Sequence, residues 1–281
     1  MRWLVTGAGG MLGRDLCAVL AAAGEPDVVT ATRAELDITD PAAVRDAVGG
    51  ADLVLNAAAW TDVDGAETAE EAATAVNGHA VRVLAEAAGK RLIHLSTDYV
   101  FAGTATTPYA EDAEPAPANA YGRGKAIGER AVLAAGGCVV RTAWLYGAHG
   151  SNFVRTMLRL AAERETVTVV DDQQGPPTWS YALARQVVAL AGAVTAGRAG
   201  PGVYHGTAAG STTWYGLARA VFAEAGLDPE RVRPTTSDRF PRPAARPAYS
   251  VLSHERWAGT GVAPLPDWRP MLTEAMPVLL G

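Results

Sequence analysis

The sequence predicts an α/β protein in which a doubly wound parallel sheet is followed by a smaller C-terminal lobe. Three observations predict this fold: short apolar strands alternate with Ala-rich helices, a glycine-rich turn follows the first strand, and prolines gather in the last third of the chain. Strands that are apolar throughout and separated by helices are typical of parallel sheets buried on both faces. We expect the sheet domain in residues 1–148. We expect the substrate-binding lobe mostly in residues 149–281, with some segments of that half returning to the sheet.

The individual elements follow from the pattern in chain order. Runs of β-branched and aliphatic residues predict strands at 2–6, 27–31, 52–56, 91–96, 137–141 and 166–170. Helical patterns occupy 14–23, 41–48, 67–89, 118–134, 152–164 and 181–196. Gly24 closes the first helix, and the second begins with Asp40 as N-cap and Pro41 in its first turn.

Composition excludes several classes of protein. Of the 281 residues 49% are hydrophobic and 19% charged, so the chain can bury a large core and is not disordered. The net charge of −6 argues against nucleic acid or a membrane surface as the main partner. The longest apolar stretch, 187–197, is too short to span a bilayer, and a strand starting at Arg2 leaves no room for a secretion signal. We therefore expect a cytoplasmic protein.

The cysteines and histidines do not predict a metal site. Cys17 and Cys138 lie far apart without metal-ligand spacing, so we expect two buried thiols in a reducing compartment. None of the five histidines pairs with Cys or another His at ligand spacing. We expect His94 in the core of a strand, and His149 and His205 in loops.

A glycine-rich turn connects the first strand to the first helix. Residues 7–13 read Gly-Ala-Gly-Gly-Met-Leu-Gly, which places Gly7, Gly10 and Gly13 in a G-x-x-G-x-x-G pattern. Glycines at this spacing allow a tight turn and the close approach of a pyrophosphate to the helix N-terminus. The turn therefore predicts a dinucleotide site on a Rossmann-type sheet, with Met11 and Leu12 beside the cofactor.

The end of the second strand bears on which dinucleotide binds. About 20 residues past such glycines an acidic side chain usually accepts a hydrogen bond from the ribose 2′-hydroxyl. Here the chain has Arg33, which is suited to a 2′-phosphate and favours NADPH. Glu35 keeps NADH open as an alternative. Asp37 and Ile38 are expected to flank the adenine.

A tyrosine and a lysine lie four residues apart on the predicted helix 118–134. Tyr121 has an ordinary pKa of about 10, so alone it is a poor acid–base group at neutral pH. The Lys125 ammonium would lower that pKa and let the pair exchange a proton with a carbonyl or alcohol oxygen. Lys125 is one of 2 lysines in a chain with 22 arginines. At the end of the fourth strand Thr97 or Ser96 would hydrogen-bond the same oxygen.

In these motifs the chain resembles the dTDP-4-dehydrorhamnose reductase family of extended short-chain dehydrogenases/reductases. The similarity runs nearly end to end, and Ser-Thr-Asp-Tyr-Val-Phe at 96–101 is its most discriminating block. It also includes 56–64, Val76-Asn77, Tyr121 with Lys125 and Gly128-Glu129, 141–147, 152–154, Asp172-Gln173, Gly175, Pro177-Thr178 and Arg246-Pro247.

The resemblance implies an activity and a set of site residues. NADPH would reduce the C4 ketone of a dTDP-4-keto-6-deoxyhexose, with Tyr121 as proton donor, Thr97 orienting the carbonyl and Lys125 holding the nicotinamide ribose. The cofactor would also border Ala57, Ala58 and Ala59. The implied contacts of the sugar nucleotide are Thr97, Asp98, Tyr99, Trp144, Asn152, Gln173 and Arg246. The resemblance also leaves a homodimer open.

Two other functions remain open at this stage. A sugar-nucleotide epimerase would retain a tightly bound NAD, and a noncatalytic regulatory subunit would bind NADP without turnover. Dehydration is disfavoured, since the related 4,6-dehydratases carry an acidic residue where this chain has Tyr99. The presence of Thr97, Tyr121 and Lys125 together favours the reductase.

Overall fold

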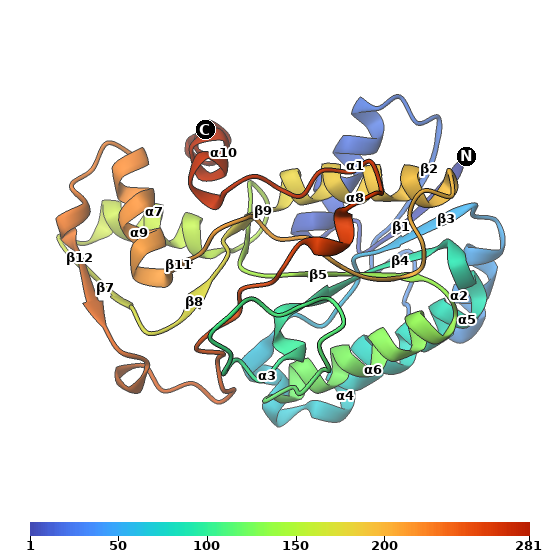
Figure 1. Ribbon diagram of the computed structural model, residues 1–281, viewed down its shortest axis with the longest axis horizontal. Coiled ribbons are helices and arrows are strands. Elements are labelled where there is room, and N and C mark those ends of the chain that lie inside the picture. Colours follow the sequence, from blue (N-terminus) through green and yellow to red (C-terminus); the bar gives the residue numbers. More distant parts are fainter.

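The computed structural model describes all 281 residues, and its centre is a six-stranded parallel sheet (Figure 1). The strand order is β10-β5-β4-β3-β1-β2, and every neighbouring pair is parallel. Their bounds are β1 (Arg2–Thr6), β2 (Asp27–Ala31), β3 (Leu53–Asn56), β4 (Leu92–Thr97), β5 (Cys138–Thr142) and β10 (Gly202–His205). Strand β2 lies on one side of β1, and β3, β4, β5 and β10 follow in that order on the other side. The strand order therefore reverses between β1 and β3. In open parallel sheets, ligands bind at the carboxyl end of the strands at such a reversal.

Helices cover both faces of the sheet, which confirms the predicted Rossmann-type fold (Figure 1). Within β1, Trp3 and Val5 pack on one face and Leu4 on the other, because successive side chains of a strand point to opposite sides. One face is covered by α1 (Met11–Ala22) and α8 (Ser180–Thr195). The other is covered by α2 (Pro41–Gly49), α5 (Val81–Ala88) and α6 (Ala120–Ala134).

The prediction of one long helix over 67–89 is wrong. The segment contains α3 (Val63–Thr68), α4 (Glu70–Thr74), a π-helical stretch (Ala75–Ala80) and α5. Within the π-helical stretch, the Asn77 amide both accepts from Trp60 N at 2.9 Å and donates to Trp60 O at 3.0 Å. Gly78 lies so close to α6 that a Cβ there would be 2.9 Å from Ile127 Cγ2. These contacts with residues distant in sequence favour the wider turn, which often occurs near functional sites.

The second half of the chain forms the lobe at the left of Figure 1 and also contributes α8 and β10 to the sheet domain. Its helices and strands are β6 (Leu145–Tyr146), α7 (Phe153–Glu163), β7 (Val167–Val170), β8 (Gln174–Gly175), β9 (Thr178–Trp179), β11 (Thr212–Thr213), α9 (Trp214–Glu224), β12 (Val232–Thr235) and α10 (Trp268–Leu280). Short 3₁₀ turns occupy Gly89–Arg91, Asp98–Val100, Pro229–Arg231, Ser237–Arg239 and Glu255–Trp257. None of the helices combines the length and apolar character needed to cross a membrane.

The histidine predictions are partly confirmed. His94 is fully buried in β4, as expected, and His149 lies in a loop. His205 was expected in a loop, but it is buried at the end of β10, where its Nδ1 lies 3.0 Å from Ser253 O. The strand was missed because it begins with Gly202 and Val203 is its only aliphatic residue.

A buried ion pair connects α6 to β5. Arg141 Nη2 lies 2.7 Å from Glu129 Oε2, and both side chains are 2% exposed. We expect Glu129→Gln to lower the free energy of unfolding by about 3–5 kcal/mol, because it leaves a buried guanidinium without its counter-charge. Urea denaturation measures this loss. Glu163→Gln is the matched control, since the exposed Arg159–Glu163 pair is expected to contribute less than about 0.5 kcal/mol. Equal losses in the two variants would contradict the prediction.

Candidate active site

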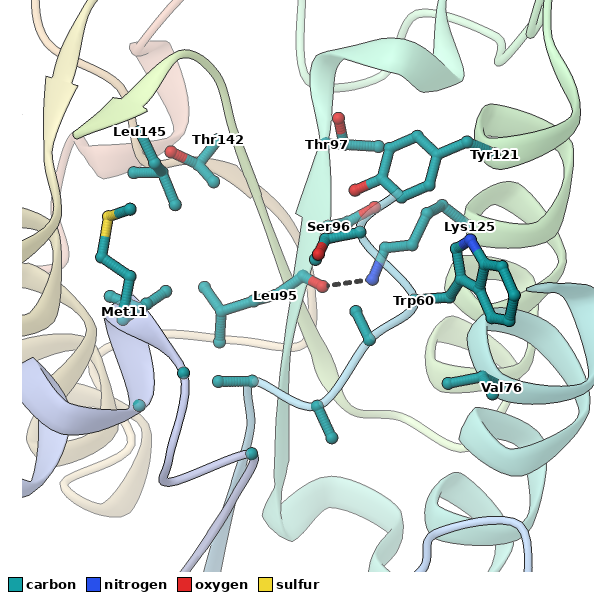
Figure 2. Close-up of a pocket in the computed structure, with 18 of the residues that line it drawn as sticks. Met11, Trp60, Val76, Leu95, Ser96, Thr97, Tyr121, Lys125, Thr142 and Leu145 are labelled. Atoms are coloured by element: carbon teal, nitrogen blue, oxygen red, sulfur yellow. Dashed lines mark hydrogen bonds between the residues drawn. The ribbon is translucent and has the colours of Figure 1, made fainter. Parts of the chain in front are cut away.

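A cavity of about 770 Å³ opens at the carboxyl end of the sheet, where the strand order reverses (Figure 2). Figure 2 shows Met11, Thr142 and Leu145 on one side and Thr97, Tyr121 and Lys125 on the other. Every residue predicted to contact the cofactor lines this cavity: Gly7, Gly10, Met11, Leu12, Gly13, Arg33, Asp37, Ile38, Ala57, Ala58, Ala59, Tyr121 and Lys125.

The glycine turn is shaped as a phosphate cradle. Gly7 has φ +69°, and a Cβ there would lie 2.5 Å from Ala58 N, so only glycine fits. A Cβ on Gly13 would clash with the Gly7 carbonyl oxygen. Gly10 caps α1 without a side-chain hydrogen bond, and the first turn of α1 contains no acidic residue. The first-turn amides of α1 are therefore free to bind an anion, which fits a dinucleotide pyrophosphate.

At the adenosine end of the cavity, Arg33 and Glu35 have different roles. Arg33 is exposed and lines the cavity. Glu35 instead accepts a hydrogen bond from Thr32 N at 2.8 Å and lies outside the lining. Hydrogen bonds from Thr39 lower the pKa of Asp37, whose carboxylate is thereby held in the same turn. Arg33 is thus the cationic side chain in this part of the lining, and a guanidinium fits a 2′-phosphate.

Tyr121 enters the cavity from the first turn of α6. Asn119 caps this helix by accepting a hydrogen bond from Gly122 N at 2.8 Å. A Cβ on Gly122 would clash with Tyr99 O, so the glycine lets α6 approach the end of β4 closely. The Tyr121 ring packs edge-on against Tyr99, with 5.7 Å between ring centroids.

Thr97 and Asp98 lie beside the Tyr121 hydroxyl. Thr97 Oγ1 donates to Asp98 Oδ1 at 3.0 Å and accepts from Tyr99 N at 3.1 Å. Burial raises the pKa of Asp98 to about 7, and its Oδ2 has no hydrogen-bond partner. Burial also raises the pKa of Tyr121 to about 12, helped by the negative charge of Asp98 and opposed by hydrogen bonding with Thr97. Tyr121 is therefore protonated at neutral pH.

Lys125 is buried next to β4 rather than directed at the Tyr121 hydroxyl (Figure 2). Its Nζ donates to Leu95 O at 2.6 Å and lies 3.2 Å from His94 Nε2. Burial lowers the pKa of Lys125 to about 8, an effect that Glu129 opposes. Lys125 is expected to lower the pKa of Tyr121, but this effect is absent from the arrangement. Burial has the largest effect on the pKa of both side chains.

Four of the predicted sugar-nucleotide contacts line the cavity: Thr97, Asp98, Tyr99 and Trp144. Trp144 has φ +48°, the left-handed region that is uncommon for a residue with a side chain. It stacks on Trp214 of the lobe with 3.5 Å between ring centroids. A Cβ on Gly175 would lie 2.5 Å from Trp144 Cε2, so this glycine leaves room for the indole.

The other three predicted contacts lie outside the lining. Asn152 caps α7 and donates to Gly147 O at 2.8 Å. Gln173 donates to Ser237 Oγ at 2.7 Å and accepts from Trp214 Nε1 at 3.1 Å. Arg246 pairs with Asp64 at 2.9 Å. The polar groups of these three side chains have partners within the chain, and their contact with a sugar nucleotide stays a prediction.

Several residues that line the cavity were not predicted, although the position of one of them, Thr142, indicates a site residue. Thr142 ends β5 beside the end of β4, and its buried hydroxyl has no hydrogen-bond partner, like that of Ser96. Polar residues at the carboxyl ends of adjacent parallel strands are candidates for ligand contact. The other missed lining residues gave no such signal: Gly9, Leu36, Trp60, Thr61, Val63, Val76, Leu95, Ala143, Leu145, Gly150 and Ser151.

Comparisons with known proteins agree with this geometry. The family model described as RmlD substrate binding domain matches residues 1–280. A dTDP-4-keto-6-deoxy-D-glucose reductase of Streptomyces niveus is 53% identical, covering 99% of this chain and 97% of that protein. A dTDP-4-dehydrorhamnose reductase of Streptomyces griseus is 52% identical, covering 100% and 94%.

A solved structure shows the same fold at high similarity. It is the dTDP-4-dehydrorhamnose reductase of Bacillus anthracis in complex with NADP, with a TM-score of 0.91 and 35% identity over 98% of both chains. The resemblance seen in the sequence motifs is thus confirmed over nearly the whole length. The chain belongs to the RmlD substrate binding domain family, together with the dTDP-4-dehydrorhamnose reductases.

Proposed function

We propose that this protein is an NADPH-dependent reductase of the C4 ketone of a dTDP-4-keto-6-deoxyhexose. The observation that carries the proposal is a single cavity with a glycine-rich phosphate cradle and Arg33 in its lining, together with Thr97, Tyr121 and Lys125. The names of the Streptomyces relatives and the NADP in the Bacillus structure support the same assignment.

The chain's own residues fit the cofactor along its length. The first-turn amides of α1 would hold the pyrophosphate, Arg33 the 2′-phosphate and Lys125 the nicotinamide ribose. When bound, NADPH supplies the hydride that reduces the ketone carbon. The unpartnered hydroxyls of Ser96 and Thr142 are available to polar groups at the nicotinamide end.

Tyr121 and Thr97 would act on the ketone oxygen. Reduction requires a proton for that oxygen, and the Tyr121 phenol, whose pKa lies far above 7, holds one at neutral pH. The Thr97 hydroxyl, which donates to Asp98, can rotate to donate to the substrate oxygen and orient the carbonyl. The carbon thus gains a hydride and the oxygen a proton, which gives the C4 hydroxyl.

The setting that we propose for this reaction is the cytoplasm. Cys17 and Cys138 are both free thiols. Disulfides form and persist mainly in oxidising compartments, so two unpaired cysteines support a reducing location.

A turnover assay tests the proposal. The protein is mixed with NADPH and a set of dTDP-4-keto-6-deoxyhexoses, and cofactor oxidation is followed by absorbance. We expect one NADPH consumed for each C4 hydroxyl formed. Retention of bound NAD with sugar isomerisation and no NADPH consumption would indicate an epimerase instead. Binding of NADP without turnover of any such sugar would indicate a regulatory subunit.

The choice of cofactor should depend on Arg33. We expect Arg33→Ser to lower kcat/KM for NADPH by about 10–100-fold, which is the usual contribution of a hydrogen bond between charged groups. The kcat/KM for NADH should stay nearly unchanged. Steady-state kinetics with both cofactors measures this. Arg45→Ser is the control, because Arg45 is exposed on α2 outside the cavity lining. Equal losses with NADPH and NADH in the Arg33 variant would contradict a 2′-phosphate contact.

A further inference from the structure

His94, on β4, is the middle member of a buried row of three polar side chains. It is 0% exposed, and it links Asn56 on β3 to Lys125 on α6. Asn56 Nδ2 lies 2.8 Å from His94 Nδ1, and Lys125 Nζ lies 3.2 Å from His94 Nε2. A buried polar side chain with both ring nitrogens engaged is more than packing, because its protonation pattern is set by its neighbours.

The backbone of Ala58 determines which nitrogen of His94 carries the proton. Ala58 N is a donor that cannot accept, and it lies 3.1 Å from Asn56 Oδ1. The same oxygen accepts from Thr6 Oγ1 at 2.6 Å, so the Asn56 amide nitrogen must face His94. His94 Nδ1 therefore accepts. Burial holds the pKa of His94 well below its ordinary value, so the ring is neutral, and because Nδ1 accepts, its proton is on Nε2.

This tautomer aims an N–H at the amine of Lys125. An ammonium at Nζ would place two donors against each other, whereas a neutral amine can accept the hydrogen bond from Nε2. The other titratable groups near Lys125 are Glu129, which is paired with Arg141, and Tyr121 with its neighbour Asp98. None of these donates a hydrogen bond to Nζ, so His94 is distinct among the neighbours of Lys125.

We propose that His94 is a positioning residue whose tautomer, fixed through Asn56 by the Ala58 amide, favours the neutral amine of Lys125. The proposal rests on the proposed reductase function for its consequence. The charge of Lys125 becomes sensitive to pH in the working range of the enzyme, and its hold on the nicotinamide ribose, and with it kcat/KM for NADPH, follows that charge.

Magnetic resonance of the protein alone tests the tautomer and the charge. The chain has five histidines and two lysines, so ring-¹⁵N-histidine and side-chain-¹³C-lysine labelling give few signals, and Lys90→Arg assigns the lysine pair. We expect the His94 proton on Nε2 in the unaltered protein. A proton on Nδ1 would overturn the proposal without any variant. Neither measurement needs cofactor or sugar, so failure of the reductase assay would not affect them.

Asn56→Asp reverses the tautomer with little change of shape. The carboxylate still accepts from Thr6 and Ala58, but it now requires a proton on His94 Nδ1, so that Nε2 accepts from the Lys125 ammonium. We expect the pKa of Lys125 to rise by at least about one unit. The same substitution in a His94→Phe background measures the direct effect of the new charge, and there we expect less than half of that rise. An equal rise in both backgrounds would overturn the proposal.

The kinetic consequence is measured on the active enzyme. In Asn56→Asp the alkaline limb of the pH profile of kcat/KM should move upward by about one unit, in step with the Lys125 pKa. Turnover at pH 7 should stay measurable, because Thr97, Tyr121 and Lys125 are intact. A profile that stays in place while the pKa of Lys125 moves would overturn the assignment of His94 to the reaction.

Discussion

Replacing Tyr121 by Phe is expected to lower kcat by about 10²–10⁴-fold, the usual contribution of a positioned general acid. The variant keeps the ring that packs edge-on against Tyr99 and removes only the hydroxyl that lines the cavity. NADPH affinity should change little, because the phosphate cradle and Arg33 are untouched. Stopped-flow or steady-state NADPH oxidation measures the rate, and fluorescence titration measures cofactor binding.

Tyr146→Phe is the matched control for this variant. The Tyr146 hydroxyl is buried, has no hydrogen-bond partner and lies outside the cavity lining. Its removal should leave kcat unchanged and confirm that loss of a buried tyrosine hydroxyl is not harmful in itself. A Tyr121→Phe enzyme with normal turnover would show that another group protonates the ketone oxygen.

Gly13→Ala is expected to weaken NADPH binding by about 100-fold, the effect of displacing a binding element by roughly 1 Å. The added Cβ would clash with the Gly7 carbonyl oxygen, so the turn and the start of α1 would have to separate. The amides that we propose to hold the pyrophosphate move with the turn, so the loss should appear in the cofactor Kd and in KM for NADPH.

Gly192→Ala separates this local effect from a general effect of removing glycine. Gly192 lies within α8, and a Cβ there meets no atom within 4 Å. This variant should gain about 0.5–1 kcal/mol in the free energy of unfolding and bind NADPH normally. Normal cofactor affinity in the Gly13 variant would show that the turn does not hold the pyrophosphate.

The strands and most helices could be predicted because their signals are local. An apolar run such as that of β4 needs no knowledge of its neighbours, and apart from 67–89 the predicted elements lie within three residues of their expected ends. The break in 67–89 could not be predicted, because it depends on contacts of Asn77 with Trp60 and of Gly78 with α6. Strand β10 was missed because Val203 is its only aliphatic residue and glycine begins it, whereas the four residues of β7 are all β-branched.

The site residues likewise divide into those with a local sequence signal and those whose direction depends on distant contacts. Gly7, Arg33, Tyr121 and Lys125 belong to motifs with fixed spacing, and all of them line the cavity. The side-chain directions of Gln173 and Arg246 could not be predicted, because a partner distant in sequence decides where each points. Arg246 is an example, since its guanidinium pairs with Asp64, 182 positions away.

The measurement that tests the central claim most directly is isotope transfer from the cofactor. The protein is given NADPH labelled with deuterium at the C4 position of the nicotinamide and a dTDP-4-keto-6-deoxyhexose, and the product is analysed by magnetic resonance. Transfer from one of the two faces of the nicotinamide should place a single deuterium on C4 of the sugar, with one NADP⁺ formed for each product molecule. A C4 hydroxyl product without deuterium from either labelled face, or a sugar that is unchanged after incubation, would contradict the account.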